Sequence, residues 1–456
     1  MPENLFRNFE PVSSKQWKQQ IQFELKGADY NETLVWNSPE DIKVKPFYHF
    51  DETEKLAASS VTNPFSICQD IFVHDLEKSI YRANDSINRG AESLRFSIAN
   101  DTIDIAKLLE NLPLEKIPVY LNLAFLSIDF VKKIDAIAAA RKATIFCNID
   151  PVGQLAKDGN WFSATEKDNF EILNKLNADC ETISIIGIDV ALYQNAGANI
   201  VQQLAYAISH TNEYFNRILP INKPILFEVA VGTNYFFEIA KIRALRLLFK
   251  AIAAEYNYNF DCHIIAKPTK RNKTIYDYNV NMLRTTTECM AAILGGANTI
   301  SNQPYDVIYH KSNEFGERIS RNQLLILKHE SYFDKVNNTA DGSYYIETIT
   351  KQLADKALIL FKEIEANGGF LVKLGEGTIQ RKIAESAEKE QELFDSGKEV
   401  LLGTNKYPNK NDKMAHDLEL FPFVKNHPRK TLITPIIEKR LAEKIEQERL
   451  ELEKTI

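Results

Sequence analysis

The middle of the chain alternates eight short apolar runs with segments of helical periodicity, and this alternation restricts the fold more than any other feature. The runs are rich in Val, Ile, Leu and Phe, which favours strands. The predicted strands are residues 66–73, 92–98, 117–125, 143–150, 182–190, 223–231, 262–267 and 297–301. Strands that alternate with helices indicate parallel β–α units. Eight units over roughly 250 residues match a closed (β/α)8 barrel of the TIM type, an α/β fold, although an open doubly wound sheet shares the local pattern.

The clearest helical segment is "TNYFFEIAKIRALRLLFKAIAAEY", which follows the sixth predicted strand. Its apolar residues recur at helical spacing and predict one apolar stripe. The stripe comprises Phe236, Phe237, Ala240, Ala244, Leu247, Leu248 and Ala251. Thr233 or Asn234 is the expected N-cap.

The glycine pair Gly295-Gly296 follows a second predicted helix, "DYNVNMLRTTTECMAAIL". Glycines that bind phosphate precede a helix, whereas a glycine just after a helix end takes the left-handed conformation. We therefore expect Gly295 to end this helix in the left-handed region and to lead into strand 297–301. The polar run "SNQPYD" (Ser301–Asp306) then lies on the C-terminal face, where barrel active sites are built.

Composition excludes several classes of function. The net charge of −7 argues against a nucleic-acid binder, which usually carries a basic patch. No apolar run approaches the ~20 residues of a membrane span, and the first residues lack the apolar core of a secretory signal. The five cysteines (Cys68, Cys147, Cys180, Cys262 and Cys289) are scattered and form no CxxC pair. They suit buried, reduced thiols in a cytoplasmic protein.

The chain divides into an arm, a barrel and a tail. Residues 1–50, with a short helical pattern around "SKQWKQQIQFEL", predict an arm that packs on a partner subunit. Residues 51–408 hold the predicted barrel, and residues 409–456 form a polar linker and a charged helix. The apolar face expected of that helix comprises Ile437, Leu441, Ile445 and Leu452.

Motifs that carry chemistry by themselves do not occur in the sequence. No two of the eight histidines have the i, i+4 spacing of a helical metal pair, and no GxSxG, GxxxxGK[ST] or strand-linked GxGxxG motif occurs. The remaining candidates are polar residues at the ends of predicted strands. They are Asn148, Asp150, Asp189, Glu228, Lys267, Lys270 and Ser301–Asp306. This level of reasoning predicts a barrel with a polar mouth.

Several longer segments resemble the methylmalonyl-CoA mutase family, the adenosylcobalamin-dependent isomerases. They include "LKGADYNETLVWNSPEDIKVKPFY", "GTNYFFEIAKIRALRLLF", "NVNMLRTTTECMAAILGGANTI", "FGERISRNQLLILKHES" and "DSGKEVLLGTNKY", in the family's order over nearly the full length. The resemblance implies a barrel that admits acyl-CoA along its axis. It also implies a cobalamin domain over the mouth and a radical 1,2-shift between methylmalonyl-CoA and succinyl-CoA.

The family's substrate groups are replaced in this chain. Ala191 and Leu192 occupy the positions of a catalytic Tyr-His pair, and leucine cannot donate a hydrogen bond to a thioester. The arginine that binds the substrate carboxylate in the family has no counterpart in "NIDPVGQLAKDGNW". Lys157 would be a poor replacement, because it lacks the planar guanidinium that binds a carboxylate through two hydrogen bonds. The Arg-Gly-Pro-Tyr pattern becomes "NPFSICQDIF", and the His-Ser-Gln-Thr-Ser-Gly-Trp segment becomes "IAKPTKRNK". Ser301 takes the place of another family histidine.

The cobalamin-binding motif Asp-x-His-x-x-Gly is also missing, and "KMAHDLEL" does not have its spacing. We therefore expect no cobalamin-binding domain and no catalytic, cofactor-binding or metal-binding residues in this chain. The combination resembles the small (beta) subunit of heterodimeric members of the family, whose large (alpha) subunit carries adenosylcobalamin and the active site. The resemblance implies such a partner.

Two alternatives remain at this stage. One is the catalytic barrel of a split mutase that uses a separate cobalamin subunit. The other is a stand-alone acyl-CoA-binding barrel. Because the substrate groups are lost, we also expect that no wide substrate tunnel runs through the barrel.

Overall fold

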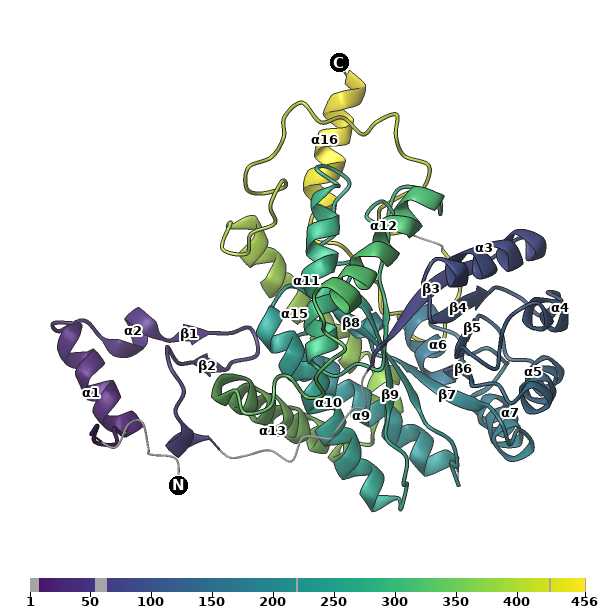
Figure 1. Ribbon diagram of the computed structural model, residues 1–456, viewed down its shortest axis with the longest axis horizontal. Coiled ribbons are helices and arrows are strands. Elements are labelled where there is room, and N and C mark those ends of the chain that lie inside the picture. The colour runs from purple at the N-terminus through teal and green to yellow at the C-terminus, as the bar shows by residue number, and fades with distance from the viewer. Residues whose placement is uncertain (1–7, 54–63, 219, 426–427, 456) are drawn as a thin grey trace.

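Eight parallel strands close into a barrel in the computed structural model, which describes residues 8–53, 64–218, 220–425 and 428–455 (Figure 1). The barrel strands are β3 (Ser66–Val73), β4 (Ser93–Ile98), β5 (Val119–Leu123), β6 (Ile145–Ile149), β7 (Ser184–Asp189), β8 (Leu226–Val231), β9 (His263–Pro268) and β10 (Thr299–Ser301). Strand β10 pairs in parallel with both β9 and β3, so the sheet has no edge there. The predicted (β/α)8 barrel is confirmed, and the open sheet is excluded.

Seven of the eight strands differ from the predicted bounds by one to three residues at one end or both, and proline precedes two of the late starts. β3 has the predicted limits, but β5 begins at Val119 and β8 at Leu226, each two or three residues later than expected. Pro118 and Pro224 precede these starts, and proline has no N–H to donate to a sheet ladder.

Helices cover the outside of the barrel and continue beyond its last strand. Those between strands are α3 (Leu76–Asn88), α4 (Ile105–Glu110), α5 (Ile128–Arg141), α6 (Pro151–Asp158), α7 (Glu166–Asp179), α8 (Ala191–Asn195), α9 (Ile200–Arg217), α10 (Tyr235–Glu255) and α11 (Val280–Leu294). Those that follow β10 are α12 (Glu314–Leu325), the π-helical turn η2 (Ile326–Glu330), α13 (Tyr344–Ala366), α14 (Phe370–Gly375) and α15 (Thr378–Asp395).

Helix α10 is buried on more than the one face that the sequence pattern predicts. Asn234 is its N-cap, as predicted, and Phe237, Ala240, Ala244 and Leu248 are buried. Phe236 is instead about half exposed, and polar side chains such as Lys241 are buried. The reason is that α9, α11 and α13 all pack against α10, so its outer side is covered as well. The prediction of one apolar stripe is therefore wrong in part.

The Gly295-Gly296 pair ends α11 and leads into β10, as expected, but the two glycines act differently from the prediction. Gly295 has a right-handed φ of −72°, whereas Gly296 has φ +88°. A Cβ at Gly295 would lie 3.0 Å from Ile242 Cβ, so Gly295 allows close packing of α11 on α10. Gly296 supplies the left-handed turn.

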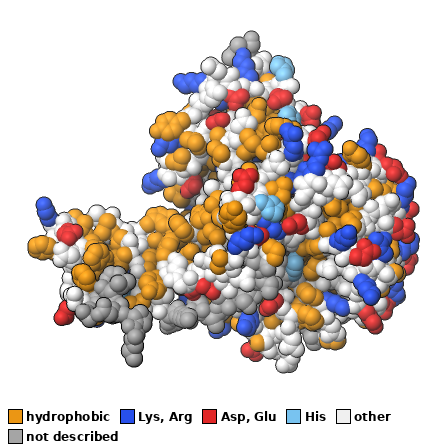
Figure 2. Space-filling view, viewed as in Figure 1, with side chains coloured by type: hydrophobic (Ala, Val, Ile, Leu, Met, Phe, Trp, Pro, Cys, Tyr) orange, Lys and Arg blue, Asp and Glu red, His pale blue; other side chains and the backbone are white. Residues whose placement is uncertain are grey.

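The arm extends away from the barrel (Figure 1). It comprises α1 (Ser14–Glu24), α2 (Tyr30–Leu34), the antiparallel pair β1 (Trp36–Asn37) and β2 (Lys43–Val44), and the 3-10 turn η1 (Phe50–Glu52). Its base contacts the barrel helices, because the Trp36 ring lies 5.7 Å from Phe237 and the Tyr48 ring lies 5.1 Å from Tyr345. Farther out, hydrophobic side chains are exposed along the arm (Figure 2).

The tail returns over the barrel before its last helix begins. Helix α16 covers Glu443–Thr455, several residues later than predicted. Residues 431–441, here called the C-terminal strap, are extended. Within the predicted apolar face, Leu441 is buried, but Ile437 and Leu452 are largely exposed. Leu450 packs instead into a cluster with Tyr276, Tyr309 and Met414, so the predicted face is wrong for Ile437 and Leu452.

The five cysteines are free and buried, as predicted. Among the helices that the structure describes, none combines the length and apolar character needed to cross a membrane.

Candidate functional site

A pocket of about 1010 Å³ lies at the C-terminal ends of the barrel strands. It is lined by the sequence candidates Asn148, Asp150, Asp189, Glu228, Lys267, Lys270 and Gln303. The predicted polar mouth therefore exists, and the structure brings these residues together. The other members of Ser301–Asp306 do not line the pocket. Ser301 Oγ donates to Asp70 Oδ1 at 2.7 Å, and Asn302 Nδ2 donates to Ser320 O on α12 at 2.9 Å, so they hold the floor and the following helix.

Arg95 is the central group of the pocket floor, and sequence reasoning did not identify it. Its Nε donates to Asp70 Oδ1 at 2.9 Å, and its Nη1 lies 2.7 Å from Glu228 Oε1. Arg95 is 7% exposed and Glu228 is 3% exposed, so their ion pair is shielded from water, whereas the Asp70 side chain is 39% exposed. Asp70 and Arg95 are neighbours across β3 and β4. Asp70 follows Cys68 by two residues, and Arg95 follows Ser93 by two, so each lies on the same face of its strand as that earlier residue. Sequence reasoning considered polar residues at strand ends and therefore missed these two inside the strands.

A second cation, Lys267, shares Glu228 with Arg95. Lys267 Nζ pairs with Glu228 Oε1, and the Nδ2 atoms of Asn122 and Asn148 donate to Oε2 at 3.3 and 3.4 Å. Burial, reinforced by the Arg95 charge, lowers the pKa of Lys267. The charges on the floor are thus paired among themselves.

Asp150, a sequence candidate at the end of β6, has a structural role. Its Oδ1 accepts hydrogen bonds from Tyr214 and from Gly153 N at 2.7 Å, lies 2.8 Å from His210 Nε2, and caps helix α6. Its Oδ2 accepts from Asp189 N at 3.0 Å. Burial acts to raise the pKa of Asp150, but His210 and these hydrogen bonds hold it below its usual value. A carboxylate with all these partners is a positioning group rather than a free base.

Ala191 and Leu192 open the short helix α8, and each is 1% exposed. Leu192 belongs to the main hydrophobic core. Neither residue lines the mouth pocket. Lys157, by contrast, lies on α6 and lines the pocket.

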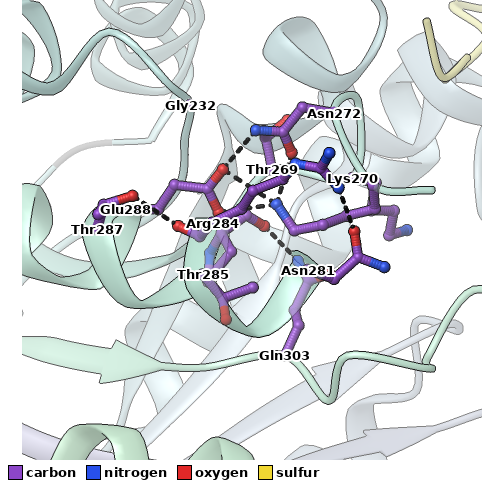
Figure 3. A network of polar contacts seen from close by, with 12 residues as sticks. Gly232, Thr269, Lys270, Asn272, Asn281, Arg284, Thr285, Thr287, Glu288 and Gln303 are labelled. Carbon is purple, nitrogen blue, oxygen red and sulfur yellow. Dashed lines mark hydrogen bonds and ion pairs between the residues drawn. The ribbon is translucent and has the colours of Figure 1, made fainter. Parts of the chain in front are cut away.

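The loop between β9 and α11 is held by a buried polar network (Figure 3). Lys273 Nζ lies 2.8 and 3.0 Å from the two oxygens of Glu288, and Asn272 Nδ2 donates to Glu288 Oε1 at 2.6 Å. On the other side of the network, Arg284 Nη1 donates to Asn281 Oδ1 at 2.8 Å. Burial raises the pKa of Glu288 and lowers that of Lys273, while each charge opposes the shift of the other. These side chains fix the loop and leave Lys267 and Lys270 facing the pocket.

Below the charged floor, aromatic rings fill the N-terminal half of the barrel. The Phe146 ring lies 5.3 Å from Tyr120 and 4.4 Å from His263. Tyr120 Oη lies 2.8 Å from His263 Nε2 and 2.7 Å from Thr299 Oγ1, so the group spans strands β5, β6, β9 and β10. Burial lowers the pKa of His263 to about 3, which keeps the imidazole neutral. These rings pack against one another inside the barrel. The absence of a wide axial tunnel stays a prediction.

The C-terminal strap covers part of the mouth through backbone hydrogen bonds to helices α6 and α8 and to the β9–α11 loop. Ile436 N donates to Ala156 O at 2.7 Å, Lys439 N to Asn195 O at 3.1 Å, and Leu441 N to Arg271 O at 2.9 Å. Arg440, which is buried, donates to Lys273 O at 2.9 Å. Sequence reasoning did not predict that the strap covers the mouth, because it placed Ile437 and Leu441 in a helix.

Comparison with known proteins gives consistent matches. Residues 94–454 match the family model described as methylmalonyl-CoA mutase. The chain is 32% identical to the methylmalonyl-CoA mutase small subunit of Porphyromonas gingivalis, over 89% of this chain and 71% of that protein. It is 27% identical to the methylmalonyl-CoA mutase of Rhizobium meliloti, over 89% of this chain and 65% of that protein. It is also 27% identical to the mitochondrial enzyme of Bos taurus, over 86% and 60%. The chain thus spans less than two thirds of the last two relatives.

Proposed function

Because this chain belongs to the methylmalonyl-CoA mutase family, we propose that it is a non-catalytic small subunit that stabilises a catalytic large (alpha) subunit. The family uses adenosylcobalamin. In this proposal the heterodimer interconverts methylmalonyl-CoA and succinyl-CoA in the cytoplasm, and the large subunit carries the cofactor. Binding of a partner to the folded chain alone stabilises the complex by mass action.

The observation that carries the proposal is the environment of Ala191 and Leu192. The family's Tyr-His pair would have to reach the pocket to polarise a substrate, yet both positions are apolar and buried. A leucine side chain in the core offers no donor to a thioester oxygen. The scaffold of the family is thus present without this catalytic pair.

The state of Arg95 argues against the split-mutase alternative. That alternative needs an arginine free to bind the substrate carboxylate. Arg95 lies in the pocket, but its guanidinium is already paired with Asp70 and Glu228. A substrate carboxylate would have to displace two carboxylates that share a buried site with it, at the cost of leaving them unpaired.

The cover of the mouth argues against a cobalamin on this chain. A corrin ring is broad and flat and needs an open mouth to lie on. Here Ile436, Lys439 and Leu441 of the strap are hydrogen-bonded to α6, to α8 and to the β9–α11 loop at the mouth. The residues present therefore do not fit the cofactor, and we assign it to the partner.

The arm is the surface that we propose for contact with the large subunit. Phe23 on α1 is 80% exposed, and Val12, Trp17 and Phe50 are at least half exposed on the same arm. Apolar side chains gathered on an extension of the fold are typical of a protein interface (Figure 2).

Co-expression with a large subunit tests the proposal. We expect a 1:1 complex whose cobalamin-dependent turnover requires the large chain, and no turnover by this chain alone. Phe23→Ser should weaken the complex, whereas Tyr81→Ser, at a 72% exposed position on α3, should not. Cobalamin-dependent mutase activity of the isolated chain would refute the proposal.

The 1010 Å³ mouth pocket supports a second candidate function, that of a stand-alone acyl-CoA-binding barrel. A calorimetric titration of the isolated chain with acyl-CoA esters distinguishes the two. Tight binding without a partner would favour the second candidate.

A further inference from the structure

Glu438, on the C-terminal strap, places its carboxylate at the edge of the mouth pocket. Its Oε1 accepts a hydrogen bond from Asn195 Nδ2 at 3.0 Å, and its Oε2 accepts from Lys270 Nζ at 3.1 Å. Asn195 and Lys270 belong to the barrel, to α8 and to the loop after β9. The carboxylate of a strap residue therefore lies in the mouth of the barrel, bound by barrel residues.

The barrel groups around this carboxylate are also held by contacts within the barrel that do not involve Glu438. Asn195 Oδ1 accepts hydrogen bonds from Thr269 Oγ1 at 2.8 Å and from Lys270 N at 3.0 Å. These two donors fix the amide so that its Nδ2 points towards Glu438. Asn195 is 2% exposed, and the rigid β9–α11 loop positions Lys270. A fixed donor beside an ammonium group is a site for an anion.

The electrostatics of the site support the same reading. Burial acts to raise the pKa of Glu438, but Lys270 and then Lys157 lower it to about 2. The pKa of Lys270 is raised in turn by Glu438. The surroundings therefore strongly favour a negative charge at this position.

This anion site opens into the pocket, and the strap holds its occupant through few contacts. Lys157, Asn195, Lys270 and Glu438 all line the pocket. The neighbours of Glu438 in the strap, Ile437 and Lys439, are exposed. Rotation of the Glu438 side chain alone would free the donors without moving the backbone bond from Lys439 N to Asn195 O.

We propose that Lys270, Asn195 and Lys157 form a binding subsite for a small aliphatic carboxylate, and that Glu438 is its built-in occupant. The ligand takes the position of the Glu438 carboxylate and extends its carbon chain into the mouth pocket. The inference goes beyond the proposed function, because it concerns this barrel alone and needs neither a partner nor turnover.

Chemical rescue on the full-length chain tests the proposal. Glu438→Ala removes the occupant, and propionate reproduces the two-methylene carboxylate that is lost. Calorimetry at constant ionic strength is expected to show saturable binding of propionate to Glu438→Ala, about tenfold tighter than to the wild-type chain, where Glu438 competes. The melting temperature of the variant should rise with propionate concentration, over the same concentration range in which calorimetry shows binding.

The controls separate a built subsite from general anion effects. Propionamide has the same shape without the charge and should not bind. Lys270→Met in the Glu438→Ala background should abolish propionate binding. Glu448→Ala, which removes an exposed carboxylate on α16, should behave as the wild type. Glu438→Gln keeps the side-chain volume and serves if the alanine variant does not fold, because a neutral amide competes poorly for Lys270. Absence of saturable propionate binding in both variants, or equal binding of propionamide, would overturn the proposal.

Discussion

Lys270 Nζ, in the loop after strand β9, lies 3.1 Å from Glu438 Oε2, and this ion pair joins residues 168 positions apart in the chain. It links the face where barrel enzymes perform chemistry to the strap that crosses it. The contact explains why this barrel presents a polar mouth with most of its charges already paired.

The stabilisation from Glu438 should depend on pH. Its folded pKa of about 2 is below the ordinary value of 4.5, so its contribution is complete above pH 4.5 and declines as the pH falls towards 2. At neutral pH we expect Glu438→Gln to cost about 1–2 kcal/mol, less than the shift alone implies because the side chain is 29% exposed. Urea unfolding of both proteins between pH 7 and pH 3.5 measures the difference. A difference that grows on acidification would contradict the assignment.

Arg95→Met should strongly destabilise the chain. It leaves Asp70 and Glu228 with only Lys267 as a nearby cation, and breaking a buried ion pair on one side costs about 3–5 kcal/mol. Arg89→Met is the matched control, because Arg89 pairs with Asp85 at the surface, where water screens the pair and its loss should change stability little. Urea midpoints compare the two. Equal effects would show that the floor pairs are not shielded from water.

Asp150→Asn should cost about 2–4 kcal/mol, because the neutral amide loses the charge facing His210 and cannot satisfy all the donors that Asp150 binds. The control is Asp75→Asn, which alters an exposed N-cap on α3 and should cost about 0.5 kcal/mol. The same urea experiment applies. A small effect at Asp150 would favour a role in binding over a role in the fold.

Leu192→His should not create activity. It puts an imidazole at a 1% exposed position in the main core, where an unsatisfied polar group costs about 2–3 kcal/mol. Leu283→His, at a 66% exposed position on α11, should change stability by less than about 0.5 kcal/mol. Thermal unfolding and a mutase assay with adenosylcobalamin measure both results. Gain of turnover in Leu192→His would contradict the non-catalytic assignment.

The five cysteines should be unreactive in the folded chain. Burial raises the pKa of the Cys68, Cys147 and Cys289 thiols, so little of the reactive thiolate forms. We expect no rapid reaction with a disulfide reagent at pH 8, and five equivalents in urea. A thiol that reacts within seconds in the folded chain would identify an accessible site.

Much of the fold could be predicted from local pattern. The run "SICQDIFV" has the limits of β3, and the helix before Gly295 ends as predicted, because strand and helix periodicity are properties of neighbouring residues. The candidate site residues at strand ends also line one pocket, because the carboxyl ends of all parallel strands in a barrel lie at the same face.

Asp70, Arg95 and Asn122 could not be chosen in the same way. Polar residues inside a strand alternate between the barrel axis and the outer helices, and the alternation alone does not tell which set faces the axis. Gln69 shows the difference. It neighbours Asp70 in sequence, yet its Oε1 accepts a hydrogen bond from Arg321 of the outer helix α12 at 2.8 Å.

The sequence by itself determined a (β/α)8 barrel of the mutase family in which Ala191 and Leu192 replace the catalytic pair. Local periodicity and residue identity carry that information without knowledge of distant contacts. Only the tertiary structure decided that residues 431–441 form a strap and not a helix. The N–H groups of Ile436, Lys439 and Leu441, which a helix would use internally, donate instead to carbonyl groups of α6, α8 and the β9–α11 loop. Those partners lie 170 to 280 positions earlier in the chain, and only the folded barrel brings them within reach of the strap.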